Sequence, residues 1–241
     1  MEEAKPRCLP TETAGFDAQT AEGRMSAGLK TVCIGWDSNE KLPWHVLADS
    51  IIENASSPVR IIPVKHYLSR PTEGSTEFSL SRFLTPWLCD YKGLALFLDC
   101  DMLVRFDINE LFDLKDDTAV QVVQHDYIPK DTVKFYKNKQ KAYRRKNWSS
   151  VMLFDCAQCT NLTPEYVELA SAMDLHQLWW TDSIGSLPLE YNHLVGEYSL
   201  SSEAKVIHWT NGGPWLHKYR NSDYAEEWQM AKYDMMWFLD E

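Results

Sequence analysis

The segment from Lys92 to Leu114, KGLALFLDCDMLVRFDINELFDL, constrains the fold of this chain more than any other. It begins as a nearly uninterrupted apolar run, which is typical of a strand buried on both faces. Two carboxylates, Asp99 and Asp101, stand at the end of that run. Aspartate is poor in strands and is almost never buried without a partner. The pattern therefore predicts a buried central strand whose end holds something positively charged.

Strand-like and helix-like patterns alternate along the rest of the chain, which predicts a mainly parallel α/β sheet flanked by helices. Ligands bind beyond the carboxyl ends of the strands in such sheets. No internal repeat or low-complexity linker divides the chain, so we expect one domain over residues 29–241, preceded by a disordered tail over residues 1–28. The further expected strands cover residues 31–36, 59–64, 118–125, 149–155 and 204–210, and the expected helices cover 42–56, 76–91 and 163–173.

Composition excludes several classes of function. The net charge is -11 over 241 residues, which argues against a general electrostatic surface for nucleic acid. The apolar runs fall short of the about 18 residues that a membrane span needs. The N-terminus lacks the apolar core of a secretory signal, and the scattered cysteines suit reduced thiols. We therefore expect a cytoplasmic protein.

Asp99 and Asp101 are two residues apart, so on a regular strand they would point to the same side. Two carboxylates that close repel each other, and one would be pushed towards protonation unless a cation lies between them. A hard divalent ion such as Mg²⁺ or Mn²⁺ resolves this repulsion and keeps open positions for phosphate oxygens. The alternative is that the two acids cap the following turn or pair with Lys or Arg.

A second motif, VIHWTNGGPW, places His208 directly after a short strand-like run. The following Asn211-Gly212-Gly213 turn lets backbone N–H groups approach a ligand closely, as phosphate-binding turns require. Together with the distant aspartate pair, His208 is a candidate third metal ligand. Alone, it would be interpreted as a hydrogen-bonded histidine of the core.

The order of these motifs resembles the GT-A nucleotide-sugar glycosyltransferases, most closely glycosyltransferase family eight and a related bacterial-type branch. FLDCDMLV is similar to the strand that ends in D-x-D, and HWTNGGPW to the C-terminal histidine signature. IGWDSN, WSSVMLFD and TDSIGSLPLEYN are similar to segments before and between them, so the resemblance covers Thr31 to about Trp215. It implies a Rossmann-like GT-A fold.

By this resemblance, Asp99, Asp101 and His208 hold Mn²⁺ or Mg²⁺, which binds the diphosphate of a UDP-sugar. Arg82 is expected to touch the donor phosphate or sugar, with a solvated helix arginine as the alternative. Asp182 is expected to face the donor sugar, with a helix cap before Ile184 as the alternative. The other expected donor-binding residues are Gly35, Trp36 and Asp37 around the uracil and ribose, and Cys100, Asn147, Asn211, Gly212, Gly213, Trp215 and Lys218.

Two departures from the family pattern bear on donor binding. Gly213 stands where the family usually has a lysine that contacts the diphosphate, so the Gly212 and Gly213 amides or Lys218 would have to replace it. Trp148 stands where the family has an asparagine, so a sugar-binding side chain is either missing or supplied by Asn147. Both departures affect the identity of the sugar more than the general activity.

The stretch Lys130–Lys146 is strongly basic in an otherwise acidic chain. It is interpreted as a solvated face, as a clamp for the diphosphate, or as a docking surface for an anionic acceptor or lipid headgroup at a membrane surface.

The predicted function is transfer of a hexose from a UDP-sugar to a glycan, lipid or other acceptor, with retention by analogy to family eight. The alternatives are a nucleotide-sugar hydrolase or nucleotidyltransferase on the same scaffold, and a non-catalytic binding module.

Overall fold

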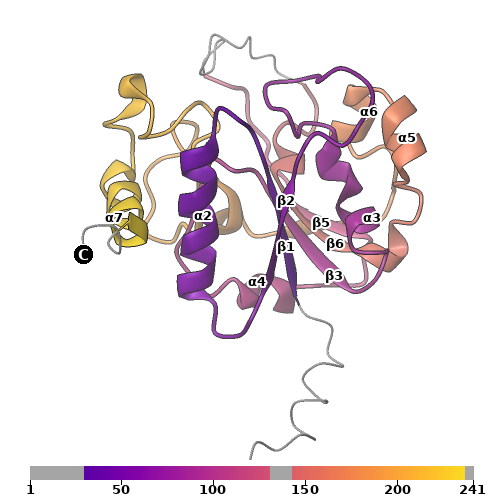
Figure 1. Ribbon diagram of the computed structural model, residues 1–241, viewed down its shortest axis with the longest axis horizontal. Helices are drawn as coiled ribbons and strands as arrows, with labels where there is room; N and C mark the ends of the chain where they lie inside the picture. The colour runs from indigo at the N-terminus through magenta and orange to yellow at the C-terminus, as the bar shows by residue number, and fades with distance from the viewer. Residues whose placement is uncertain (1–29, 131–142, 237–241) are drawn as a thin grey trace, which may run out of the picture.

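A six-stranded sheet forms the centre of the computed structural model, which describes residues 30–130 and 143–236 (Figure 1). Its strands lie in the order β2-β1-β3-β6-β5-β7. β6 is antiparallel to both of its neighbours, and the other three pairings are parallel, which confirms the expected mainly parallel sheet. The strands are β1 (Thr31–Gly35), β2 (Arg60–Val64), β3 (Leu94–Leu98), β5 (Val120–Val123), β6 (Val151–Asp155) and β7 (Ile184–Leu187).

The apolar run that opens the sequence analysis forms β3, between β1 and β6. Ala95, Leu96, Phe97 and Leu98 have no exposed surface. Burial on both faces explains why this strand shows no polar alternation. Because β3 lies between β1 and β6, its carboxyl end is at the middle of the sheet.

A second, three-stranded sheet begins where β3 ends. It consists of β4 (Met102–Val104), β9 (Val206–His208) and β8 (His193–Leu194), in that order. The link between the two sheets is Asp99-Cys100-Asp101. The sequence pattern predicted that the two aspartates lie on one regular strand, and they do not. The expectation was wrong because the chain changes sheets within three residues.

Helices cover both faces of the central sheet (Figure 1). On one side lies α2 (Lys41–Asn54), which also contacts β4 and α7 (Ala225–Met236). On the other side lie α3 (Thr85–Leu88), α5 (Pro164–Leu169) and α6 (Ala172–His176). The remaining helical pieces are α4 (Asn109–Asp113) and the 3₁₀ turns η1 (Ser81–Leu84), η3 (Trp148–Ser150), η4 (Cys156–Gln158), η5 (Leu189–Asn192) and η6 (His217–Tyr219).

Two expected helices are shorter than the sequence pattern suggests. Residues 76–91 form a turn, η1 and then α3, because Asp37 binds the Glu77 amide and holds the first part of the segment in a turn. Residues 163–173 divide into α5 and α6, because the Ser171 hydroxyl accepts a hydrogen bond from the Asp174 amide and starts a new helix. The expected helix over 42–56 is confirmed as α2.

No helix in the described part of the chain is long and apolar enough to span a membrane. The predicted tail over residues 1–28 lies outside the described residues, so the boundary at residue 29 stays a prediction.

Gly35, the last residue of β1, is required by packing. A Cβ atom placed on Gly35 would lie 2.3 Å from the Phe78 ring. That ring is fully buried and also contacts the Phe97 ring of β3.

We therefore expect Gly35→Ala to lower the free energy of unfolding by about 1–3 kcal/mol. The cost should shrink in a Phe78→Leu background, because the smaller side chain leaves room for the methyl group. Chemical denaturation of the four proteins of this double-mutant cycle measures both effects. An unchanged stability of Gly35→Ala alone would contradict the packing argument.

Candidate metal and nucleotide site

A cavity of about 460 Å³ lies at the carboxyl end of β3. This volume is within the range of small-molecule sites, and the position is the one expected for an α/β sheet. Six residues that the sequence analysis singled out line it together: Arg82, Asp99, Cys100, Asp101, Asn147 and His208. Although Arg82 and His208 are far apart in the chain, the fold brings them to one place.

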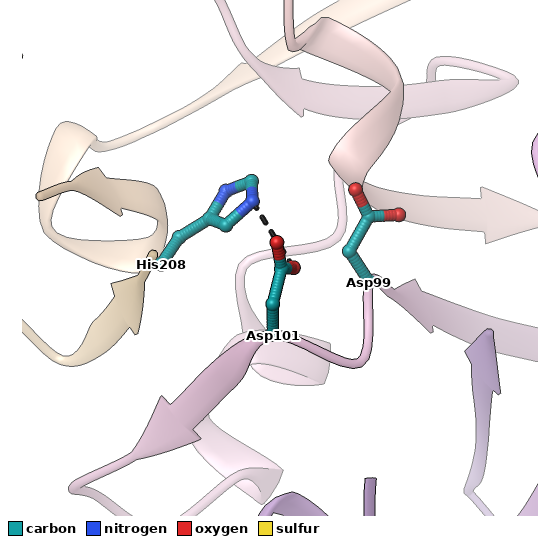
Figure 2. A group of neighbouring side chains, drawn as sticks. All are labelled: Asp99, Asp101 and His208. Atoms are coloured by element: carbon teal, nitrogen blue, oxygen red, sulfur yellow. Dashed lines mark ion pairs between the residues drawn. The ribbon is translucent and has the colours of Figure 1, made fainter. Parts of the chain in front are cut away.

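Asp99, Asp101 and His208 form a compact group in this cavity (Figure 2). One ligand atom from each lies within 4.8 Å of the other two. Asp101 is 9% exposed and His208 is 1% exposed. The arrangement follows from the pairing of β4 with β9, which sets Met102 opposite His208, and from the Trp209 amide, which donates to the Asp101 carbonyl at 2.9 Å.

The His208 ring is oriented by Asn192. Its Nδ1 donates to the Asn192 Oδ1 at 2.9 Å, so the lone pair of the neutral ring is on Nε2. Nε2 faces the Asp101 Oδ1 at 3.3 Å. Two lone pairs at that distance repel each other, so either a proton on Nε2 or a cation close to both atoms is required. This geometry suits a metal ligand whose second nitrogen is fixed by a hydrogen bond.

Asp99 already has one positive partner. The Arg82 Nη1 lies 2.7 Å from the Asp99 Oδ1. Arg82 is 5% exposed, donates to the Ser79 and Ser149 carbonyls, and lies against the Phe78 and Phe97 rings. The solvated-helix interpretation of Arg82 was therefore wrong, and the interpretation that an aspartate pairs with Arg applies to Asp99.

The donor set of this group fits a divalent cation. Two carboxylates and one imidazole are ligands of Mn²⁺ and of other divalent transition metals, and carboxylates are the ligands of Mg²⁺. The cation expected from the sequence is thus compatible with the residues that the fold places here.

Cys100 lies between the two aspartates and is buried. Burial, with the Asp101, Glu40 and Asp99 charges, raises the pKa of its thiol well above the ordinary value. Cys100 is therefore a neutral thiol in the cavity wall.

Glu40 lines the same cavity and was not singled out from the sequence. Its side chain is 2% exposed, and neither carboxylate oxygen has a hydrogen-bond partner. Burial, then the charges of Asp101 and Asp37, raise the pKa of Glu40 to about 8. The nearby Trp215 indole N–H, which itself has no hydrogen-bond partner, lowers this pKa in part. In the sequence, an acid beside a helix N-terminus is explained by its favourable interaction with the helix dipole, so this role was hidden.

Lys146 and His176 also line the cavity and were missed as individual residues. Lys146 is 6% exposed, and its ammonium lies over the Tyr143 ring. His176 contacts the Ser149 hydroxyl at 2.8 Å. Burial, then the Arg82 and Lys146 charges, lower the pKa of His176 to about 3, so its ring is neutral at physiological pH. The signals available for Lys146 were its place at the end of the basic stretch and its position directly before Asn147.

The residues expected to cradle the nucleotide at the end of β1 do not line this cavity. The Asp37 carboxylate accepts hydrogen bonds from the Asn39 and Glu77 amides. Trp36 packs edge-on against Trp44, and Gly35 accommodates the Phe78 ring. These contacts stabilise the turn after β1, so a direct role in nucleotide binding stays a prediction.

The glycine-rich turn after His208 is largely occupied by internal contacts. Asn211 donates to the buried Glu197, and Gly213 lies against the Trp215 ring, which a Cβ would meet at 2.1 Å. Gly212 adopts a positive φ of 114°, which only glycine adopts readily. Lys218 is exposed and contacts Tyr219. None of these residues lines the cavity, whereas Asn147 does, held by Tyr127 and Thr210.

Asp182 does not lie where the resemblance implied. It is exposed, and it comes two residues before β7 begins at Ile184. The strand register sets Ile184 level with Ala95, near the start of β3, so Asp182 lies towards the opposite edge of the sheet from Asp99. The expectation that Asp182 faces the donor sugar was wrong. Because β7 runs parallel to β3, a residue that precedes β7 lies at the amino ends of both strands, away from the cavity at the carboxyl end of β3.

Residues 131–142 of the basic stretch lie outside the described residues. Of the rest, Lys130 donates to the Gly196 carbonyl, Arg145 donates to the Gln177 carbonyl, and Lys146 lines the cavity. Of these three residues, Lys146 alone lines the cavity. The interpretations of the stretch as a diphosphate clamp or as a docking surface for an acceptor or a membrane stay predictions.

Comparison with solved structures shows the fold. The WbbM bifunctional glycosyltransferase covers 88% of the chain with a TM-score of 0.62 at 15% identity, and the glycosyltransferase GlyE of Streptococcus pneumoniae covers 84% with a TM-score of 0.56 at 14% identity. This chain spans 51% and 60% of those two proteins. The galactosyltransferase LgtC, of which it spans 95%, gives a TM-score of 0.53 at 13% identity. The fold is therefore that of GT-A glycosyltransferases.

Comparison with the sequences of known proteins identifies a relative of this chain. No protein-family model matches the chain. The Arabidopsis thaliana protein named Protein CDI is 40% identical over 224 residues, which cover 84% of this chain and 86% of the relative. Such identity over most of both proteins shows common descent, and the chain belongs to the family of Protein CDI.

Proposed function

We propose that this protein is a metal-dependent glycosyltransferase that moves a hexose from a UDP-sugar to a glycan, lipid or other acceptor. The observation that carries the proposal is the Asp99, Asp101 and His208 group in a cavity at the carboxyl end of β3, in a chain with the GT-A fold. WbbM, GlyE and LgtC, which share this fold, are glycosyltransferases by name.

Asp99, Asp101 and His208 would hold Mn²⁺ or Mg²⁺, which supplies Lewis-acid stabilisation of the charge that develops on a leaving diphosphate. Two cationic side chains of the chain would also stabilise the negative charge of the diphosphate. The buried Arg82 and the buried Lys146 both line the cavity. Lys146 is better placed than Lys218 to replace the family lysine for which Gly213 stands, because Lys218 is exposed and does not line the cavity.

Retention of the anomeric configuration follows only from the resemblance to family eight, and membership of that family is part of the proposal.

The direct test is calorimetric titration of UDP-, GDP- and dTDP-sugars with and without Mn²⁺. We expect UDP-sugar binding that requires the metal and that falls at least about 100-fold in Asp101→Ala, because a buried ligand charge is lost. Asp117→Ala, which removes an exposed acid of similar size, is the matched control. Nucleotide binding of equal strength without metal would contradict the metal dependence. Release of free sugar or monophosphate regardless of acceptor would favour a hydrolase or nucleotidyltransferase.

A second test concerns the hydrogen bond that orients His208. Asn192→Leu removes the acceptor for the His208 Nδ1 while keeping the number and branching of the side-chain heavy atoms. We expect Mn²⁺ affinity, measured by titration without nucleotide, to fall about 10- to 100-fold, as for other partners of ligating histidines. Asn192→Leu also removes the donor to the Ser150 hydroxyl. Asn161→Leu is the control for the same substitution elsewhere, because it removes an amide that donates to the Trp180 carbonyl and does not contact His208. Unchanged Mn²⁺ affinity in a folded Asn192→Leu protein would count against His208 as a ligand.

A further inference from the structure

Glu40 occupies an unusual position for a buried acid. It follows the turn after β1 and directly precedes α2, and its backbone is held by the Asp37 carbonyl and the Trp44 amide. The Glu40 side chain makes no cap hydrogen bond to α2 and lines the cavity. Its carboxyl group is therefore buried in the wall that also contains Asp101.

An unpartnered buried carboxyl group is costly, because both oxygens have left water without replacement. Neither Glu40 oxygen has a hydrogen-bond partner, and the side chain is 2% exposed. A group of this kind that lines a cavity is explained if a bound molecule completes its hydrogen bonds.

The chemistry of the cavity limits what that molecule presents to Glu40. The metal-binding group includes Asp99, Asp101 and His208 but not Glu40, so Glu40 is not a fourth member of the metal-binding group in this geometry. A phosphate is better matched by Arg82 and Lys146, the two cations that line the same cavity. A hydroxyl group fits, because it is neutral and both donates and accepts.

We propose that Glu40 is a substrate-binding residue whose carboxyl group forms a hydrogen bond with a hydroxyl group of the bound nucleotide-sugar. This inference rests on the proposed function, since it needs a hydroxyl-bearing nucleotide-sugar in the cavity. The hydroxyl group belongs either to the ribose or to the hexose, and the two sources respond differently to changes in the ligand.

The test compares Glu40→Leu, which keeps the size but removes all hydrogen bonding, with Glu40→Gln, which keeps a donor and an acceptor. Titrations at saturating Mn²⁺ use UDP, 2′-deoxy-UDP, 3′-deoxy-UDP and UDP-hexoses. We expect Glu40→Leu to bind the UDP-hexose about 5- to 20-fold more weakly than the wild type does. This is the usual effect of one lost hydrogen bond in a buried site. Glu40→Gln should restore most of the affinity. Both variants should fold, because they remove an unpartnered buried carboxyl group.

The ligand series identifies the hydroxyl group. If it belongs to the ribose, Glu40→Leu also weakens binding of UDP, and one of the two deoxy nucleotides loses affinity in the wild type but not in Glu40→Leu. If it belongs to the hexose, UDP binds all three proteins equally and only the UDP-hexose discriminates between them.

The proposal is overturned if Glu40→Leu binds every ligand as the wild type does. It is also overturned if Glu40→Leu loses Mn²⁺ affinity in the absence of nucleotide, which would make Glu40 a metal ligand. A wild type that binds no nucleotide with Mn²⁺ would refute the proposed function itself, and with it this inference, so the two failures are distinguishable.

Discussion

Repulsion among the acidic groups at the junction of the two sheets is the constraint on which the rest of this site depends. Asp99, Asp101 and the lone pair of His208 Nε2 converge within 4.8 Å, and the two most buried of these side chains have almost no contact with water. Negative groups in such a place are stable only if positive charge balances them. Arg82 supplies one charge to Asp99. The remaining pair, Asp101 and His208, is the part that a proton or a divalent cation must balance.

The fold creates this convergence by changing sheets. Asp99 directly follows β3, at the middle of the central sheet. Asp101 directly precedes β4, and the pairing of β4 with β9 places His208 beside it. The His208 ring is then fixed by Asn192, which is fully buried and also donates to the Ser150 hydroxyl. A site assembled from two sheets and a buried hydrogen-bond chain changes little with surface motion, which is the property that a ligand set requires.

Strand patterns and the distant motifs allowed much of this to be predicted. The apolar run of β3 indicated a central strand, and the pairing of D-x-D with His208 indicated a shared site, because strong local patterns and residue chemistry both pointed there. Polar residues at other strand ends were harder to interpret. Asp37 binds backbone amides, and Gly213 makes room for a tryptophan ring. Sequence does not distinguish a residue that holds a turn from one that holds a ligand.

The residues that the sequence did not reveal depend on tertiary structure. Glu40 was hidden because an acid beside a helix N-terminus is already explained by the helix dipole. Lys146 was hidden because the basic stretch pointed to a charged segment and not to one of its lysines. Asp182 was misplaced because resemblance aligned its segment without the strand register. In each case the location of the residue depends on the direction of a side chain or a strand, which the sequence pattern does not give.

The most direct measurement is an anomalous difference map from a crystal soaked with Mn²⁺ and UDP. The account predicts a manganese peak bound by Asp99, Asp101 and His208, with the diphosphate on its open side and near Lys146. A map without that peak, in which Arg82 still holds Asp99 and a proton alone joins His208 to Asp101, would contradict it.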